Sequence, residues 1–317
     1  MYEKWKGVHT RCAFNMIQEL IPLTRPRTLA AALGPTILGA AFSYYAFGAA
    51  QGTGLAIFHT MLIFLAVVTA QIVANLWNEY KDVKSGLDAG QKVGNAGSIT
   101  RGVITPELII TMIKVLMFVP IIIGLYLSAT ITWYYIPVGF LCILISFLYS
   151  GGPKPISRTP FGEISSGIAM GFTIVLITGY AWIRELSLAL LIPAIPSTLL
   201  VGSIMLTNNI RDIRNDESHG RHTLPIVLGR ERALSLMSIS YIFNFIWIIA
   251  WIIVGHMTWF ALLAFLAAPL AFKTIHTLST NTDEFQLDKA MGTTAGAAMI
   301  YQLMWAIGLI TVSYTHL

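Results

Sequence analysis

Oxygen-bearing side chains recur at helical spacing in two parts of this sequence. The first group contains Gln71, Asn75, Asn78, Glu79, Asp82 and Asp88. Four of these residues, from Gln71 to Asp82, are spaced four, three and four positions apart, so in a helix they lie on one face. The second group is Asn208, Asp212 and Asp216, again spaced by four residues. Each group therefore predicts a stripe of carboxamide and carboxylate oxygens along a helix.

Such stripes are chemically suited to a divalent cation. Two facing rows of carboxylates repel each other unless a cation lies between them. Oxygen ligands with basic neighbours suit Mg²⁺ that bridges to a phosphate. Magnesium usually takes one or two carboxylates per ion, so the two groups together can hold one or two ions that carry a diphosphate. The candidate metal ligands are Asn78, Glu79, Asp82, Asp88, Asn208, Asp212 and Asp216.

Basic residues near both groups can neutralise the remaining charge of a diphosphate. The candidates are Arg25, Lys84, Arg101, Lys154, Arg211 and Arg221. An alternative explanation of the Asn and Asp residues is that they only cap helix ends or lie solvated in loops. Two groups with the same spacing at the same membrane depth argue against capping alone, because charged residues on membrane helices are costly and usually functional.

The elements that position these groups are membrane helices. Of the 317 residues, 56% are hydrophobic and 11% are charged, whereas about a quarter are charged in soluble domains. This excludes a soluble globular protein. Windows long enough to cross a bilayer, roughly 20 helical residues each, lie at 28–50, 55–77, 106–128, 131–150, 163–183, 187–207, 232–254, 258–275 and 290–313. We therefore predict an all-α polytopic membrane protein with nine transmembrane helices.

The distribution of charge predicts how these helices are oriented. The connections alternate between short and long, and the long ones are polar, among them 78–105 and 208–231. Of the 20 Lys and Arg residues, all but Lys114 and Arg184 lie in or beside the N-terminal segment and these long connections. By the positive-inside rule this face is cytoplasmic, with the N-terminus inside and the C-terminus outside. The net charge of +5 is thus a topology signal and does not indicate a nucleic-acid partner.

The N-terminal segment predicts a leader rather than a span. Residues 1–27 lack the compact apolar core and small-residue cleavage site of a signal peptide. Their mixed basic and apolar character is typical of an amphipathic segment on a membrane surface. We expect an uncleaved cytoplasmic leader over 1–27, followed by one transmembrane domain over 28–317. Cys12 and Cys142 lie in different environments and predict no disulfide framework.

Several motifs together resemble the UbiA superfamily of intramembrane aromatic prenyltransferases, in the right order along most of the chain. Its first aspartate-rich motif is similar to Asn78-Glu79-Tyr80-Lys81-Asp82 with Gly86 and Asp88. Its second is similar to Asn208-Asn209-Ile210-Arg211-Asp212 with Asp216, Gly220, Thr223 and Leu224. Supporting segments are Arg25-Pro26, Gly97-Ser98, Arg101-Gly102 and Tyr149-Ser150-Gly151-Gly152-Pro153-Lys154-Pro155. Position 79 is Glu where the superfamily commonly has Asp, so this carboxylate sits on a longer arm.

This resemblance implies a nine-helix bundle around a central cavity, with cytoplasmic loops over its mouth. It also implies Mg²⁺-dependent transfer of a polyprenyl chain from its diphosphate to a small aromatic acceptor, by a protein embedded in the lipid bilayer. Asp82 and Asp212 would act in catalysis through the metal, and the ring of Tyr149 would stabilise the allylic cation by about 1 to 2 kcal/mol. The diphosphate would be bound by Arg25, Arg101, Lys154, Arg211 and Arg221.

The form of the second motif also indicates an acceptor. Its double asparagine favours 1,4-dihydroxy-2-naphthoate, which would lose its carboxylate and give demethylmenaquinone in menaquinone biosynthesis. Within the superfamily, 4-hydroxybenzoate, homogentisate, haem or chlorophyllide acceptors would use the same metal motifs.

Two other classes share parts of this pattern. A cation-coupled transporter also places carboxylates on membrane helices, but usually near the bilayer midplane at broken helices, whereas these groups lie at helix ends. Broken helices remain an alternative because four prolines lie within the windows: Pro120, Pro137, Pro193 and Pro196. A CDP-alcohol phosphotransferase would need a denser run of Asp residues than this sequence contains.

Overall fold

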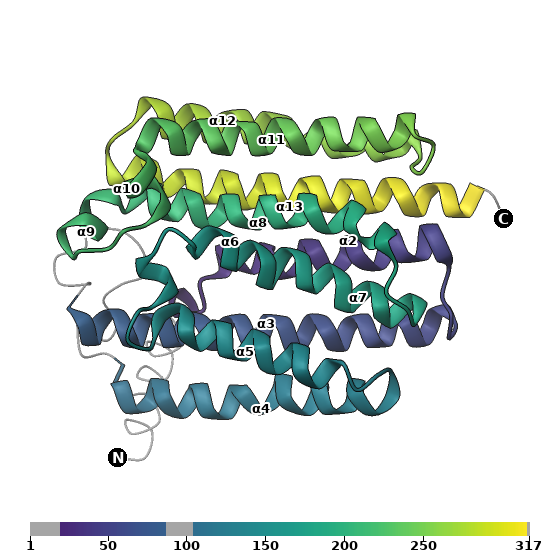
Figure 1. The fold of residues 1–317 in the computed structure, drawn as a ribbon, viewed down its shortest axis with the longest axis horizontal. Helices are drawn as coiled ribbons and strands as arrows, with labels where there is room; N and C mark the ends of the chain where they lie inside the picture. Colours follow the sequence, from purple (N-terminus) through teal and green to yellow (C-terminus); the bar gives the residue numbers. More distant parts are fainter. Residues whose placement is uncertain (1–19, 87–103, 316–317) are drawn as a thin grey trace, which may run out of the picture.

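The computed structural model describes residues 20–86 and 104–315 as a bundle of helices (Figure 1). The elements are η1 (Pro26–Leu29), α2 (Ala30–Phe47), α3 (Thr53–Ser85), α4 (Pro106–Thr130), α5 (Tyr135–Ser150), η2 (Ile156–Arg158), α6 (Gly162–Ser166), η3 (Gly167–Phe172), α7 (Thr173–Ile183), η4 (Leu188–Leu190), α8 (Leu191–Arg211), α9 (Ile213–Ser218), α10 (Leu224–Leu228), α11 (Arg230–Ile253), η5 (Trp259–Ala267), α12 (Ala268–Thr280) and α13 (Glu284–Thr315). These elements confirm the all-α fold class.

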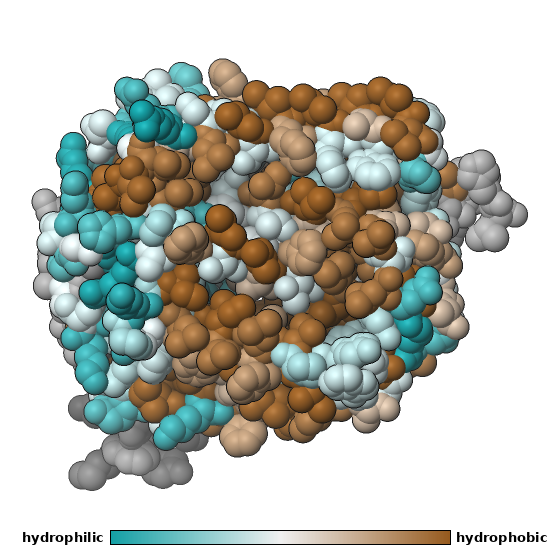
Figure 2. All heavy atoms as spheres, viewed as in Figure 1, coloured by the Kyte–Doolittle hydropathy of each residue, from teal (hydrophilic) through white to brown (hydrophobic). Residues whose placement is uncertain are grey.

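The helices fit a membrane in length and in surface character. Among the described residues, 7 helices, with joined segments counted as one, are long and apolar enough to cross a bilayer. In addition, α5 is a shorter apolar helix and α2 has 18 residues. Figure 2 shows apolar side chains over the middle of the molecule and polar ones gathered at the end that carries α9 and α10. The chain is a multi-pass membrane protein, while the count of nine crossings stays a prediction.

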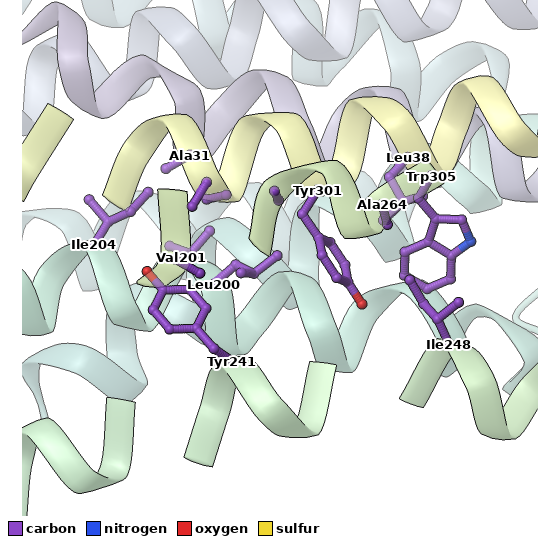
Figure 3. Packing of buried hydrophobic residues seen from close by; sticks show 14 of the residues in the cluster. Ala31, Leu38, Leu200, Val201, Ile204, Tyr241, Ile248, Ala264, Tyr301 and Trp305 are labelled. Atoms are coloured by element: carbon purple, nitrogen blue, oxygen red, sulfur yellow. The ribbon is translucent and has the colours of Figure 1, made fainter. Parts of the chain in front are cut away.

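The largest hydrophobic core lies among α2, α8, α11, η5, α12 and α13. Trp305 and Tyr301 of α13 are its largest fully buried side chains, and Figure 3 shows them beside Ala264 and Leu38. Small residues such as Ala264 let the helix axes approach closely, because little side-chain volume separates them. This part of the bundle holds α8, which carries the second polar group, firmly against α13.

A second set of helices, α3, α4 and α5, packs around two smaller hydrophobic clusters, and α3 also contacts α2 and α7. Leu76 of α3 and Ile109 of α4 are fully buried in one cluster near the polar end, and Ile63 and Leu127 belong to another near the opposite end. α5 packs against α3 and α4, whereas the α6–η3–α7 segment packs against α2 and α8. The space between these two sets of helices is where the cavity described below lies.

The window at 163–183, expected as one regular helix, contains a π-helical turn. This turn, η3, runs from Gly167 to Phe172, and Thr173 Oγ1 donates to Ile168 O at 2.9 Å. Its two glycines contact the backbone of α8, where an added Cβ on Gly167 would lie 2.6 Å from Thr198 O. Such turns often occur at functional sites, and this one lies where η3 crosses α8 closely.

Candidate active site

The end of α3 carries the first group of polar side chains. α3 continues as a helix through Ser85, so the helical spacing predicted for Asn78 and Asp82 is confirmed. The Asn78 amide contacts Ser150 Oγ at 2.8 Å. In the amide orientation that gives both its oxygen and its nitrogen hydrogen-bond partners, the oxygen accepts from the Arg25 guanidinium at 3.1 and 3.2 Å. The nitrogen then donates to Asp82 at 3.2 Å. Arg25, Asn78 and Asp82 thus form one hydrogen-bonded row.

Glu79 lies beside this row and is buried. Its side chain is 2% exposed, and its Oε2 lies 3.8 Å from Arg25 Nη2. Arg25 has a φ of 51°, which is uncommon for a residue other than Gly, and Glu79 is one of the groups that hold its side chain. Glu79 thus forms an ion pair with Arg25, and its role as a metal ligand stays a prediction.

Arg221 joins the first polar group to the second. Its Nη2 lies 2.8 Å from Asp82 Oδ1 on α3, and its Nη1 lies 3.3 Å from Asp216 Oδ1 on α9. Gly220 adopts a φ of 67°, which Gly takes without strain, and in this turn the Arg221 backbone N–H donates to Asp216 O at 3.0 Å. None of the three charged side chains is more than 14% exposed. The tertiary structure thus brings the two groups together around a guanidinium.

Arg211 organises the end of α8 in a similar way. It donates to both carboxylate oxygens of Asp212 at 2.7 Å and to Asn208 Oδ1 at 2.9 Å. It also forms an ion pair of 2.9 Å with Asp288 on α13. A guanidinium has five N–H donors in a planar fork, so one side chain can hold all three partners. Asp288 was absent from the sequence prediction because 77 residues separate it from Arg211.

Asp216 is buried and has a raised pKa. Burial raises its pKa to about 7, and the negative charges of Asp212 and Asp82 add to the shift, while Arg221 and Arg211 oppose it. The buried carboxylate is therefore easily neutralised in the absence of a further cation. A divalent ion nearby would favour the ionised form.

A cavity of about 280 Å³ inside the bundle begins beside these polar groups, as the resemblance implied. Arg25, Asn78 and Asn208 line its polar end. At the far end Tyr135 is buried, and its hydroxyl donates to Ile177 O at 2.6 Å, which links α5 to α7 and forms the floor. The lining stripe on α3 covers 15 helical steps, or about 22 Å at 1.5 Å per residue. The cavity is thus a long apolar space with one charged end.

Tyr149 lies in the wall near the charged end. It lines the cavity, and its hydroxyl donates to Met205 Sδ at 3.0 Å. An added Cβ on Gly162 would lie 3.4 Å from this hydroxyl, so α6 approaches Tyr149 closely. The next residue, Glu163, is buried and accepts from Asn209 Nδ2 at 2.8 Å. This pair fastens α6 to α8, and the sequence contained no signal for the role of Glu163.

The remaining predicted residues are less closely tied to the site. Lys154 is exposed in the loop after α5, and its role in diphosphate binding stays a prediction. Asp88 and Arg101 lie outside the described residues. Conversely, Arg158 acts electrostatically on Asp82, and it was not among the residues predicted for the site.

The donor groups do not form a ready-made cluster of acids. Within residues 20–86 and 104–315, no three His, Cys, Asp or Glu side chains gather closely enough to hold a metal ion by themselves. Asp82 and Asp216 instead face the same guanidinium, with the Asn78 amide alongside. A cation bound here would therefore need Asn oxygens or waters in addition to carboxylates.

The fold and the site define a polytopic membrane protein in which an aspartate-rich, arginine-rich end opens into a long apolar cavity. A model of the UbiA prenyltransferase family matches residues 32–312. The chain belongs to this family, which confirms the resemblance found in the motifs.

Relatives of known activity match nearly the whole chain. It is 35% identical over 307 residues to the 1,4-dihydroxy-2-naphthoate octaprenyltransferase of Bacillus subtilis (strain 168), covering 95% of this chain and 94% of that one. It is 30% identical over 292 residues to the enzyme of the same name from Mycobacterium tuberculosis (strain ATCC 25618 / H37Rv), covering 90% and 93%.

Solved structures share the fold. A UbiA homolog from Aeropyrum pernix K1 has a TM-score of 0.68 at 18% identity, covering 90% of this chain and 98% of that one. A UbiA homolog from Archaeoglobus fulgidus, bound to DMAPP and Mg²⁺, has a TM-score of 0.59 at 15% identity, covering 91% and 99%.

Proposed function

We propose that this prenyltransferase moves a polyprenyl chain from its diphosphate to 1,4-dihydroxy-2-naphthoate, with Mg²⁺ as cofactor and with loss of carbon dioxide. The observation that carries the proposal is that Asp82 and Asp216 flank one cation, Arg221, at the charged end of an apolar cavity. The relatives named for this activity over most of their length support the choice of acceptor. The product would be demethylmenaquinol, the reduced form of demethylmenaquinone and an intermediate of menaquinone biosynthesis.

The residues at the charged end fit Mg²⁺. They are hard oxygen donors, and a guanidinium stands where a cation is needed between two carboxylates. Asn78, Asp82, Asn208, Asp212 and Asp216 would hold the ion or ions. When bound, Mg²⁺ would neutralise charge on the diphosphate and so make it a better leaving group.

The reaction balances without a further co-reactant. The allylic C–O bond breaks, and the oxygen keeps the electron pair as the diphosphate leaves. The ring carbon that bears the carboxylate forms a C–C bond to the first carbon of the chain. Loss of carbon dioxide from that ring carbon then returns an electron pair to the ring and restores its aromaticity.

The residues of this chain stabilise and shield that process. Arg25 and Arg211 would share the charge that develops on the diphosphate. The ring of Tyr149 borders the cavity and would stabilise the allylic cation. The apolar walls down to Tyr135 would take up the isoprenoid tail and keep water from the cation.

We also infer the orientation of the protein in the membrane. The polar end of Figure 2 carries α9 and α10, and 18 of the 20 Lys and Arg residues lie in or beside the N-terminal segment and the long polar connections, of which 208–231 is one. By the positive-inside rule the charged end of the cavity would face the cytoplasm, with the N-terminus inside and the C-terminus outside. A C-terminal reporter that is active in the cytoplasm would contradict this orientation.

The direct test of the function is a transfer assay with purified protein in lipid. A radiolabelled polyprenyl diphosphate is incubated with each candidate aromatic acid, with Mg²⁺ or with EDTA. We expect a lipid-soluble product and carbon dioxide with 1,4-dihydroxy-2-naphthoate, and none with EDTA. Product with another acceptor alone would correct the substrate, and no product with any acceptor would overturn the proposal.

Cation binding at Asp216 should depend on pH. A ligand carboxylate must be ionised, and the pKa of Asp216 is raised to about 7 in the metal-free protein, so below this pH a proton must leave when Mg²⁺ binds. We expect the Kd for Mg²⁺ to rise by about tenfold per unit as the pH falls below 7 and to level off above it. Calorimetry in two buffers of different ionisation enthalpy measures the released proton; equal release at pH 6 and 8.5 would contradict this assignment.

The length of chain that the cavity accepts should depend on Gly139. This residue lines the cavity, and no heavy atom lies within 4 Å of an added Cβ. It is ten helical steps from Tyr149, about 15 Å along α5, so Gly139→Phe would block the distal part of the tail. We expect the rate with octaprenyl diphosphate to fall about tenfold relative to the rate with geranyl diphosphate. A tenfold change corresponds to about 1.4 kcal/mol, which is within the usual cost of overpacking.

The matched control for that prediction is Gly292→Phe. Gly292 is an exposed glycine of α13 with open space around its Cα, so the same substitution adds a ring outside the cavity. A competition assay with both diphosphates gives the ratio directly. An unchanged ratio in Gly139→Phe would place the tail elsewhere.

A further inference from the structure

Arg221 stands between two carboxylates that the proposed function assigns to Mg²⁺. Its two terminal nitrogens lie 2.8 Å from Asp82 and 3.3 Å from Asp216. The two acids come from α3 and α9, so this one guanidinium closes the end of the bundle. A metal ion that contacts both carboxylates would lie next to the guanidinium, and two positive charges at such a distance repel strongly in a buried site.

The few contacts that hold the Arg221 guanidinium allow it to move away from the two carboxylates. Its Nε is buried but has no hydrogen-bond partner among the described residues, so the guanidinium is held by the two ion pairs at its tip. Its backbone is fixed separately, through the N–H bond to Asp216 O in the turn after Gly220. By contrast, Arg211 is held by Asp212, Asn208 and Asp288 together.

We propose that Arg221 is an internal counter-cation that competes with Mg²⁺ for Asp82 and Asp216 and moves to the diphosphate when the two bind together. In the metal-free protein it neutralises the two acids and joins α3 to α9. This inference rests on the proposed function, and it assigns Arg221 a positioning role beyond diphosphate binding alone.

A thermodynamic consequence follows for the two ligands. When Mg²⁺ binds alone, it must displace the Arg221 guanidinium from the two carboxylates, and the guanidinium finds no new anion to pair with. When a diphosphate binds as well, its charge gives the guanidinium such a partner. Mg²⁺ and diphosphate should therefore bind cooperatively, and the coupling must be the same whichever ligand binds first. Without the Arg221 side chain, Mg²⁺ alone has nothing to displace, so it should bind more tightly and the coupling should shrink.

The experiment compares wild type with Arg221→Ala. The Kd for Mg²⁺ is measured by calorimetry with and without inorganic pyrophosphate, at a pH of about 8 so that Asp216 is ionised. We expect Arg221→Ala to bind Mg²⁺ alone at least about tenfold more tightly than wild type, and pyrophosphate to improve that affinity about tenfold less. An Mg²⁺ affinity that is unchanged or weaker in the variant, with unchanged coupling, would overturn the proposal.

A matched control removes the same charge elsewhere at the polar end. Arg230 donates to the carbonyl oxygens of Leu278 and Asn281, so Arg230→Ala should leave both the Mg²⁺ affinity and its coupling to pyrophosphate at wild-type values. If Arg230→Ala also tightens Mg²⁺ binding tenfold, a general charge effect explains the result and the proposal is wrong.

Stability provides a second readout that does not require activity. Arg221→Ala removes the guanidinium that lies between Asp82 and Asp216, so its melting temperature in EDTA should fall, and Mg²⁺ should raise it more than in wild type. Arg221→Gln, which keeps hydrogen-bond donors, serves the same comparison if the Ala variant does not fold in EDTA. If wild type itself binds no Mg²⁺, the proposed metal site is wrong. If wild type binds Mg²⁺ but neither variant changes the affinity or the coupling, the metal site stands and only the proposed role of Arg221 is wrong.

Discussion

Replacing Asp82 or Asp212 with Ala should nearly abolish prenyl transfer while the protein still folds. The two carboxylates come from the two motifs that flank the charged end of the cavity, where we propose that charge develops on the leaving diphosphate. Loss of one electrostatic stabiliser in such a site typically lowers the rate by about 10²- to 10³-fold, and loss of a ligand to the metal should cost at least that. Initial rates with saturating Mg²⁺ and labelled diphosphate measure the effect.

Glu217→Ala is the matched control for these variants. Glu217 is exposed on α9 directly after Asp216, so its removal changes the charge by the same amount at the same end of the molecule. We expect wild-type rates in this variant, and melting temperatures within a few degrees of wild type in all three. Full activity in both Asp82→Ala and Asp212→Ala would exclude these carboxylates from the site.

Gly171→Val should disrupt the packing that places the second motif. An added Cβ at Gly171 would lie 2.6 Å from Ser197 O and equally close to the Thr198 backbone. These are backbone atoms of α8, which cannot rotate out of the way as a side chain can. Overpacking in a core typically costs about 1–3 kcal/mol, and the cost here should lie at or above the upper end, with α8 and its Asn208 displaced from the cavity.

Thermal unfolding in detergent, together with the transfer assay, measures that effect. Gly292→Val is the control, since Gly292 is exposed on α13 and an added Cβ meets nothing within 4 Å. We expect a clear drop in melting temperature and in rate for Gly171→Val and neither for the control. A Gly171→Val protein as stable and active as wild type would mean that η3 and α8 do not pack as described.

Several features of the molecule could be read from local sequence. The windows of apolar residues are set by the need to satisfy backbone hydrogen bonds inside a bilayer, so they predicted the membrane helices. The spacing of Asn78 and Asp82 follows the 3.6-residue period of a helix, and the structure keeps both on α3. Even so, the window at 163–183 did not predict the π-helical turn η3, whose glycines Gly167 and Gly171 lie against the backbone of α8.

The sequence by itself therefore determined the fold class, the family and which residue types lie at the polar end, because helical period, apolar length and motif spacing are local properties. The tertiary structure alone decided which of those residues meet. Arg221 pairs with Asp82 across 139 positions, and Arg211 pairs with Asp288 across 77. Likewise Tyr135 forms the cavity floor through a carbonyl on α7. Such pairings depend on how whole helices pack, so they cannot be predicted from residues that are neighbours in the sequence.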